Sequence, residues 1–350
     1  MTMSAPFTLS GTAIPQDARH MLDQICEHFT EHANVSRVDD VVVMKNDEAR
    51  TEIRLAGERL LIDLACPSDQ ALQTTRIMLA EHMFYFAGED PLDLQWSAPA
   101  PLGPLGNLHH VTVTGAEDIT PHMRRVRVAC ADVSPFLDGN MHVRVLIPPA
   151  DRLPVWPGVR DDGRIAWPEG EDELVVRVYT IRKVDVQTGE LWIDFFQHPM
   201  PGVSTPGADF ARDAQPGDRI ALLGPGGGGR PEAQSLLLIG DETALPAILR
   251  ILEELPETAT AEAIIEVMNA EEEQPVSSKG NVPLRWLHRE TAGHTNALRT
   301  AAQEAIAASA PDRYIWIACE KEDIRILRPL LKTRDREKGR SYLAWYWERD

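Results

Sequence analysis

Cysteine is scarce in this 350-residue sequence, and its four cysteines, Cys26, Cys66, Cys130 and Cys319, lie far apart. No two of them have Cys-x-x-Cys spacing, so the sequence indicates neither an iron–sulfur cluster nor a zinc knuckle. Isolated cysteines of this kind fit reduced thiols in the cytosol.

Long apolar runs and an excess of positive charge are also missing. Residues 1–10 lack the basic start and apolar run of a signal peptide, and no later segment has the uncharged stretch of a membrane span. The formal net charge of -19 argues against nonspecific binding to nucleic acid or anionic membrane, because phosphate groups attract clustered Lys and Arg. We therefore expect a soluble, cytoplasmic protein, monomer or dimer, that meets anionic ligands with a local basic patch.

Apolar residues are plentiful at 43%, enough for two or three compact domains in a chain of this length. The first domain, residues 1–97, mixes helical and strand patterns and is expected to be α+β. Its helices are predicted over 17–33 and 71–87, and its strands over 40–45, 51–56, 59–65 and 92–96. Its role does not follow from the sequence.

A Pro- and Gly-rich linker, residues 98–107, separates this domain from a second one over 108–229. Short apolar runs there predict a six-stranded antiparallel β-barrel, with the Pro- and Gly-containing segment 148–172 as an excursion from it. The predicted strands are 110–114, 122–130, 142–147, 174–184, 191–197 and 218–223.

The pattern changes again in residues 230–350, where buried strands alternate with helices, as in a parallel sheet covered on both faces. Strands are predicted over 235–239, 263–268, 284–288, 314–318 and 341–347, and helices over 245–255, 294–308 and 321–333. The four glycines 226–229 just before this domain are not a P-loop, because no Gly-Lys-Ser/Thr follows. They predict a flexible hinge.

The segment Arg177-Val178-Tyr179-Thr180-Ile181-Arg182 places an aromatic ring, a hydroxyl and two guanidinium groups on one predicted strand. Because side chains alternate across a strand, Arg177 and Tyr179 share one face, and Thr180 and Arg182 share the other. Arg177 is suited to clamp a pyrophosphate and Tyr179 to lie against a flat ring. An ordinary half-exposed strand is the alternative.

Several short motifs recur in the order known from one protein family. They are Arg-x-Tyr-Thr at 177–180, Asp194-Phe195-Phe196-x-His198, Pro206-Gly207-Ala208, Pro216-Gly217-Asp218, Gly224-Pro225, residues 240–247, residues 316–320 and Tyr346-Trp347. From Leu108 to its end the chain resembles the siderophore-interacting proteins, FAD-dependent ferric siderophore reductases related to ferredoxin reductases. The resemblance implies a flavin-binding barrel followed by a nicotinamide-binding α/β domain.

The resemblance implies that FAD is bound by Arg177, Tyr179 and Thr180, with the loop containing His198, Gly207 and Ala208 along its phosphates. Glycine allows close backbone approach, and helix-start amides receive anionic oxygens. Alternatively, the glycines only serve turns. Thr180 reaches the same ligand only if the strand bends after Tyr179 or if its backbone makes the contact.

The donor, NADPH or NADH, is expected where a strand ends and a helix begins, at Gly240, Asp241, Thr243 and Ala244. We expect the amides of Thr243 and Ala244 to be free to meet a phosphate. Asp241 and the adjacent Glu242 would repel phosphate, so helix capping is the alternative for them. Glu266 and Asn269 do not decide between the two nucleotides.

The family's basic pocket for anionic siderophores is only partly retained. Its candidate residues, each alternatively an ordinary solvated charge, are Arg144, Arg182, Arg230, Arg340 and Arg349. The expected activity is NAD(P)H-dependent reduction of a ferric siderophore or another ferric chelate, with release of Fe(II). The redox chemistry belongs to FAD, so no residue need act as acid, base or nucleophile.

Two other functions remain open at this point. One is a general flavin reductase or an electron-transfer flavoprotein of the ferredoxin-reductase type. The other is a siderophore or metal carrier, suggested by His20, Cys26, His28 and His32 on the first helix. No third ligand with compelling spacing accompanies His28 and His32, so no metal site is predicted. The first domain itself resembles an uncharacterised small domain sometimes fused upstream of siderophore-interacting proteins.

Overall fold

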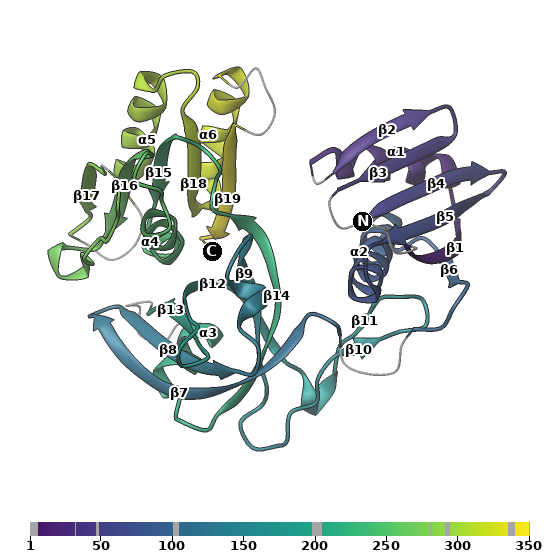
Figure 1. The fold of residues 1–350 in the computed structure, drawn as a ribbon, viewed down its shortest axis with the longest axis horizontal. Helices are drawn as coiled ribbons and strands as arrows, with labels where there is room; N and C mark the ends of the chain where they lie inside the picture. Colours follow the sequence, from purple (N-terminus) through teal and green to yellow (C-terminus); the bar gives the residue numbers. More distant parts are fainter. Residues whose placement is uncertain are drawn as a thin grey trace. The chain divides into compact units, whose positions relative to one another are not determined.

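The computed structural model describes residues 6–31, 33–46, 49–100, 105–197, 205–280, 282–290, 295–334 and 340–349. The chain forms two compact units. The first unit comprises residues 1–108 together with 149–174, and the second comprises residues 109–148 and 175–350 (Figure 1).

The first unit is an antiparallel sheet with two helices packed against it, which confirms the predicted α+β class. Its strands, in the spatial order β2-β3-β4-β5-β1-β6, are β1 (Phe7–Pro15), β2 (Asn34–Val38), β3 (Val41–Lys45), β4 (Arg50–Ala56), β5 (Arg59–Cys66) and β6 (Leu92–Trp96). The helices α1 (Ala18–His28) and α2 (Asp69–Ala87) share one apolar core with the sheet, and η1 (Phe29–Glu31) follows α1. Each helix begins at a side-chain cap, since Asp17 accepts from the His20 amide and Ser68 from the Ala71 amide.

The segment 149–174 leaves the barrel sequence and packs on this first unit. It carries β10 (Gly158–Val159), β11 (Ile165–Ala166) and η3 (Gly170–Asp172). Trp96 Nε1 donates to the Asp162 carbonyl at 2.8 Å, and Arg76 donates to the Asp161 carbonyl at 3.1 Å. Because the residues that receive the segment lie on α2 and β6, the expected excursion is an integral part of the first unit.

The second unit begins with a closed six-stranded antiparallel barrel of spatial order β12-β13-β8-β7-β14-β9, as predicted. Its strands are β7 (Leu108–Thr120), β8 (Met123–Cys130), β9 (Asn140–Ile147), β12 (Val175–Asp185), β13 (Glu190–Phe196) and β14 (Arg219–Gly229). Two short helices accompany them, η2 (Ser134–Phe136) and α3 (Pro206–Asp213). Alternating Val, Ile and Leu side chains fill the barrel interior.

The glycine run 226–229 is the end of strand β14, so the predicted flexible hinge is wrong. Gly226 pairs with His142 and Gly229 with Asn140 on β9. A Cβ atom at Gly228 would lie 2.7 Å from the ring of Tyr342, and one at Gly227 2.9 Å from the ring of His142. The glycines therefore let two rings pack directly on the strand.

The rest of the second unit is a five-stranded parallel sheet of order β17-β16-β15-β18-β19, which confirms the predicted parallel α/β class. The strands are β15 (Ser235–Gly240), β16 (Thr260–Val267), β17 (Leu284–His288), β18 (Tyr314–Glu320) and β19 (Ser341–Trp347). Helix α4 (Leu245–Glu253) covers one face, and α5 (Ala297–Ala308) and α6 (Lys321–Arg334) cover the other. Strand β16 leads into η4 (Ala270–Glu272).

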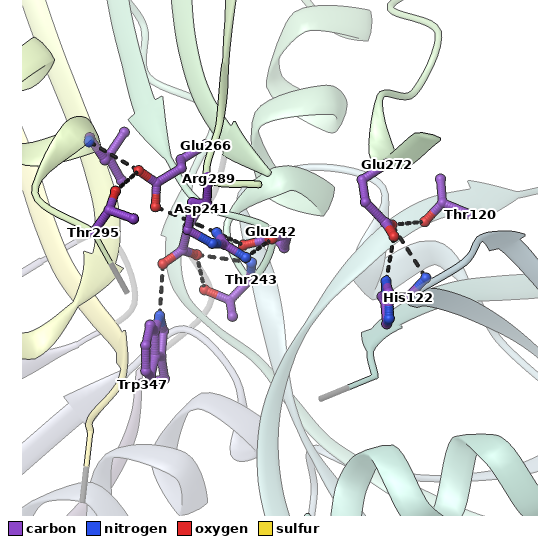
Figure 2. A network of polar contacts seen from close by, with 11 residues as sticks. Thr120, His122, Asp241, Glu242, Thr243, Glu266, Glu272, Arg289, Thr295 and Trp347 are labelled. Atoms are coloured by element: carbon purple, nitrogen blue, oxygen red, sulfur yellow. Dashed lines mark hydrogen bonds and ion pairs between the residues drawn. The ribbon is translucent and has the colours of Figure 1, made fainter. Parts of the chain in front are cut away.

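Two polar junctions join the barrel to the parallel sheet within this unit. At the first, Arg250 of α4 is buried and donates to the carbonyls of Ile181 and Phe136, each at 2.8 Å. At the second, Glu272 of η4 accepts from the Thr120 hydroxyl and the His122 ring, each at 2.5 Å (Figure 2). No helix in the described part of the chain is both long and apolar enough to cross a membrane.

Candidate functional site

The side chain of Tyr179, on strand β12, lies between strand β13 and the start of helix α3. Its ring centroid is 4.2 Å from that of Phe195, and a Cβ atom at Gly207 would lie 2.0 Å from its hydroxyl oxygen. Only glycine therefore permits α3 to begin against this ring, and the adjacent Ala208 is buried. Burial raises the pKa of Tyr179 to about 12, so the phenol is neutral.

Arg177 stands two residues before Tyr179 on the same strand and is exposed. One guanidinium nitrogen donates to the Val176 carbonyl at 2.8 Å. Among the described residues no carboxylate pairs with it, so its remaining donors face solvent. A planar cation in this state is suited to bind a phosphate oxygen pair.

Thr180 is directed to the other face of strand β12, as alternation requires. It is buried, and its hydroxyl lies 3.2 Å from Nδ1 of His142, its cross-strand partner on β9. The other ring nitrogen of His142 lies 3.0 Å from the hydroxyl of Tyr346. Burial, together with the charge of Arg250, lowers the pKa of His142 to about 4, so the imidazole is neutral.

The described residues at this barrel edge fit a flavin dinucleotide. We call three of their features together the cradle. They are the neutral ring of Tyr179, the exposed guanidinium of Arg177 and the start of α3, which has no room for a side chain at Gly207. Thr180 does not complete it on the same face, because the irregularity in the pairing of β12 with β13 begins only after Ile181. His198 lies outside the described residues.

Gly240 ends strand β15 at the carboxyl edge of the parallel sheet. A Cβ atom there would lie 2.5 Å from that of Ala244 and 2.9 Å from the Ala318 carbonyl. This glycine lets α4 start against the sheet, which is a structural reason for it independent of any ligand.

The two amides expected to be free at this edge are already bonded. The amide of Thr243 donates to the Asp241 carboxylate at 2.9 Å, and that of Ala244 to the Asp241 carbonyl at 3.1 Å. Asp241 is buried and also accepts from the indole of Trp347 at 2.7 Å (Figure 2). The expectation of free amides was therefore wrong, because Asp241 folds the chain into a turn that occupies them.

A buried ion network lies beside this turn (Figure 2). Arg289, which directly follows β17, forms a bidentate pair with Glu242 and lies 3.4 Å from Glu266. Burial raises the pKa of Asp241, Glu242 and Glu266, while the charge of Arg289 opposes that rise. Sequence reasoning missed Arg289, although its place after a buried parallel strand was a usable signal.

Glu266 and Asn269 are likewise engaged within the protein. Glu266 accepts from the Thr295 hydroxyl at 3.0 Å and the Leu298 amide at 3.1 Å, and Asn269 caps η4. The carboxyl edge of this sheet has the position of a ligand site, but its described polar groups satisfy one another.

The five candidate substrate arginines differ in their surroundings. Arg182 is buried in a bidentate pair with Glu253, and Arg349 pairs with Glu320 at 3.3 Å, so both have structural partners. Arg230 and Arg340 are half-buried. Arg144 is exposed on β9, two residues from His142 and thus on the same face of the strand.

In the histidine cluster of the first unit, His28 packs against other aromatic rings. The His28 ring packs against those of Phe29, His82 and Phe86, with 4.8 Å between the two imidazole centroids. His32 lies outside the described residues, and no group of three or more His, Cys, Asp or Glu in the described ranges is arranged to hold a metal ion.

Three family models match successive parts of the chain. Residues 12–97 match an uncharacterised protein family conserved in bacteria, residues 112–229 match the siderophore-interacting FAD-binding domain, and residues 233–350 match the siderophore-interacting protein model.

Individual relatives agree with these models. The ferric vibriobactin reductase ViuB of Vibrio cholerae serotype O1 is 29% identical over 240 residues, which cover 66% of this chain and 86% of that protein. A siderophore utilization protein from T. fusca is 34% identical, with a TM-score of 0.59 over 69% of this chain and 93% of its own. The siderophore-interacting protein SipS from Aeromonas hydrophila is 25% identical, with a TM-score of 0.57 over 70% of this chain and 93% of its own.

Proposed function

This chain belongs to the siderophore-interacting protein family, and we propose that it is an FAD-containing, NAD(P)H-dependent reductase of ferric siderophores. The observation that carries the proposal is the cradle of Arg177, Tyr179 and Gly207 at the barrel edge. The name of the Vibrio cholerae relative, a ferric vibriobactin reductase, supports the same substrate class.

The chain's own residues bind and orient in this proposal. Arg177 holds the phosphates, Tyr179 offers its ring to the flat part of the cofactor, and Gly207 and Ala208 let the backbone approach closely. When bound, FAD accepts a hydride and passes on single electrons, which is chemistry that the side chains do not supply. Fe(II) binds hard oxygen chelators more weakly than Fe(III), so iron is released.

The donor nucleotide is assigned to the carboxyl edge of the parallel sheet, around Gly240 to Ala244. Because the Thr243 and Ala244 amides are bonded to Asp241, phosphate must be bound by other groups or after this turn rearranges. Either NADH or NADPH is compatible with the described side chains. For the ferric siderophore, Arg144 is the first candidate contact, since it is exposed and carries no carboxylate partner in the described chain, with Arg230 and Arg340 after it.

The deciding experiment is an absorption spectrum of the purified protein. It is followed under anaerobic addition of NADH or NADPH and then of a ferric catecholate. We expect a flavin spectrum that bleaches with the nucleotide and returns with the chelate, with Fe(II) trapped by a colorimetric chelator. Protein that is colourless and takes up no FAD contradicts the proposal.

A general flavin reductase or an electron-transfer flavoprotein is the second candidate. It is favoured by the internal pairing of Arg182 and Arg349, which reduces the number of unpaired cations for an anionic chelate. Turnover on ferric catecholates, ferric citrate, quinones and free flavin separates the two functions. A protein without preference for any ferric chelate is the second candidate.

A further inference from the structure

The turn at residues 160–165, which we call the docking turn, is bound by side chains of α2 and β6 in the first unit. Trp96 donates at 2.8 Å and Arg76 at 3.1 Å to two consecutive carbonyls of the docking turn. In return, the amide of Ile165 donates to the carboxylate of Glu81 at 2.7 Å. Three backbone groups of the turn are therefore each bonded to a different side chain.

Gly163 brings the docking turn close to α2 and β6. Its φ is +95°, and a Cβ atom there would lie 2.9 Å from Trp96 Nε1 and 3.2 Å from the Cβ atom of Ala80. The next residue, Arg164, places its guanidinium carbon 3.6 Å from the centroid of the Phe84 ring. The turn is thus recognised by its backbone, by the absence of a side chain at one position and by a cation on an aromatic ring at the next.

The docking turn also has its shape fixed by its own hydrogen bonds. The amide of Gly163 donates to the Arg160 carbonyl at 2.9 Å, and the amide of Arg160 donates to the Arg164 carbonyl at 2.8 Å. The Asp162 carboxylate accepts from the Arg164 amide at 2.9 Å and from its guanidinium at 2.7 Å. A segment that is preorganised in this way loses little conformational entropy when it is bound.

The buried guanidinium of Arg76 depends on the docking turn for its charge balance. Arg76 is 1% exposed, and no carboxylate in the described ranges forms an ion pair with it. Burial lowers the pKa of Arg76, whereas the charges of Asp161 and Asp162 raise it. Because a buried cation without counter-charge is costly, a residue that only filled space on α2 would not require a guanidinium. This position on α2 therefore fits a turn that carries carboxylates.

The two sides of this contact belong to different protein families. Helix α2 and strand β6 lie within the match to the uncharacterised family over 12–97, whereas the docking turn lies within the match to the FAD-binding domain over 112–229. Along the chain, the turn lies on the connection from β9, which carries Arg144, to β12, which carries Arg177. The first domain thus binds the connection between two strands of the barrel.

We propose that the first domain is a recognition module whose ligand is the docking turn of the barrel. Through α2 and β6 it binds an Arg-Asp-Asp-Gly-Arg turn, so that the connection between β9 and β12 is held by a domain other than the barrel itself. This role is independent of the proposed reductase activity.

The test cuts the first domain from the rest of the full chain without removing it. A protease site is inserted after Ala100, the N-terminus carries a dye, and dye anisotropy is followed as the cut protein is diluted. We expect the two wild-type pieces to stay together. Gly163→Ala should weaken their association by about 10- to 100-fold, because the added methyl overlaps atoms of the first domain. The matched control is Gly170→Ala, also at a glycine with positive φ (+65°) but with nothing within 4 Å of the added methyl.

A second variant and a second measurement make the result independent of how Gly163→Ala folds. Trp96→Phe keeps a ring beside Gly11 and removes only the N–H that donates to the docking turn. It should weaken the association by about 10-fold. In the uncut chain, hydrogen exchange of residues 158–166, measured by mass spectrometry, should be faster in both variants but not in Gly170→Ala.

Wild-type pieces that separate on cutting contradict the proposed role of the first domain. Gln70 also donates to the Gly106 carbonyl across the cut, so the variants decide whether the turn is responsible for the association. If Gly163→Ala and Trp96→Phe associate as tightly as Gly170→Ala, the docking turn is not the ligand. FAD uptake by the uncut wild type tests the proposed function separately.

Discussion

The barrel edge around Tyr179 and the sheet edge around Asp241 are both places where a dinucleotide is expected, yet their polar groups are in opposite states. At the barrel edge the Arg177 guanidinium is exposed, with a single bond to a carbonyl. At the sheet edge Arg289 is buried between Glu242 and Glu266, and the amides of Thr243 and Ala244 are bonded to Asp241.

The difference separates groups held ready for a ligand from groups that hold the protein together. An exposed cation loses little when its ligand is absent, so removing it should cost affinity but not stability. A buried ion network has the opposite property, because each partner is needed to compensate the others. Substitutions at the barrel edge should therefore change ligand affinity, and substitutions at the sheet edge should change the stability of the protein.

The largest effect is expected for Arg289→Met. The variant leaves the carboxylates of Glu242 and Glu266 buried without their counter-charge, which should lower the free energy of unfolding by about 3–5 kcal/mol. Chemical denaturation measures it, and Arg285→Met, at an exposed arginine on β17, the strand that Arg289 follows, is the control. If the Arg289 variant is as stable as the wild type, the sheet edge is not the closed network described above.

The second largest effect is on how stability changes with pH, and its sign should differ between His142 and Asp241. In His142 the folded state binds its proton only near pH 4, against 6.5 in the unfolded chain, so stability falls as the pH drops between these values. Wild type should therefore lose on the order of 2 kcal/mol of stability relative to His142→Gln on acidification from neutral pH to about 4.5.

Asp241→Asn provides the opposite case. Burial raises the pKa of Asp241, so the folded state keeps a proton that the unfolded state loses as the pH rises above the ordinary value of 3.8. Wild type should thus gain stability relative to this variant on acidification, where it loses stability relative to His142→Gln. Denaturant titrations of the three proteins at both pH values check this, and equal shifts for the two variants would contradict the assignment.

Arg177→Ala should have the third largest effect, and it should change FAD affinity but not stability. Loss of charge-assisted hydrogen bonds worth roughly 1.5–3 kcal/mol should weaken FAD binding by about 10- to 150-fold, while the melting temperature of the FAD-free protein stays unchanged. Fluorescence titration with FAD measures the affinity, with Arg219→Ala, an exposed arginine on β14, as the control. Unaltered FAD affinity in Arg177→Ala would remove the main support for the cradle.

The fold was largely readable from the sequence, because apolar alternation and buried runs are local signals. Strand β1 was missed, since Phe7–Pro15 contains Ser, Gly, Thr and Pro, which weaken a strand pattern. The destination of segment 149–174 was also missed. Trp96 meets Asp162 from 66 positions away, and no local pattern encodes such a contact.

The sequence predicted where the candidate site residues lie, but not whether their polar groups are exposed or already hydrogen-bonded within the protein. The strand carrying Arg177 and Tyr179 and the turn after Gly240 were both found from motifs. That Asp241 occupies the neighbouring amides depends on a turn held by Trp347, 106 positions later in the chain. Burial and engagement are tertiary properties, so the two edges looked alike in the sequence.

The smallest effect is expected for Gly207→Ala, which tests how tightly the cradle is built. The added methyl would lie 2.0 Å from the Tyr179 hydroxyl oxygen and 2.9 Å from its nearest ring carbon, so α3 or the ring must move. Such overpacking should cost about 1–3 kcal/mol of stability and also weaken FAD binding. Tyr179→Phe removes the closest atom, so the double variant should recover part of the loss, measured as a coupling energy between the two sites. Additive losses would mean that the ring and the helix start do not touch, and the barrel edge would then lack the cradle that distinguishes it from the sheet edge.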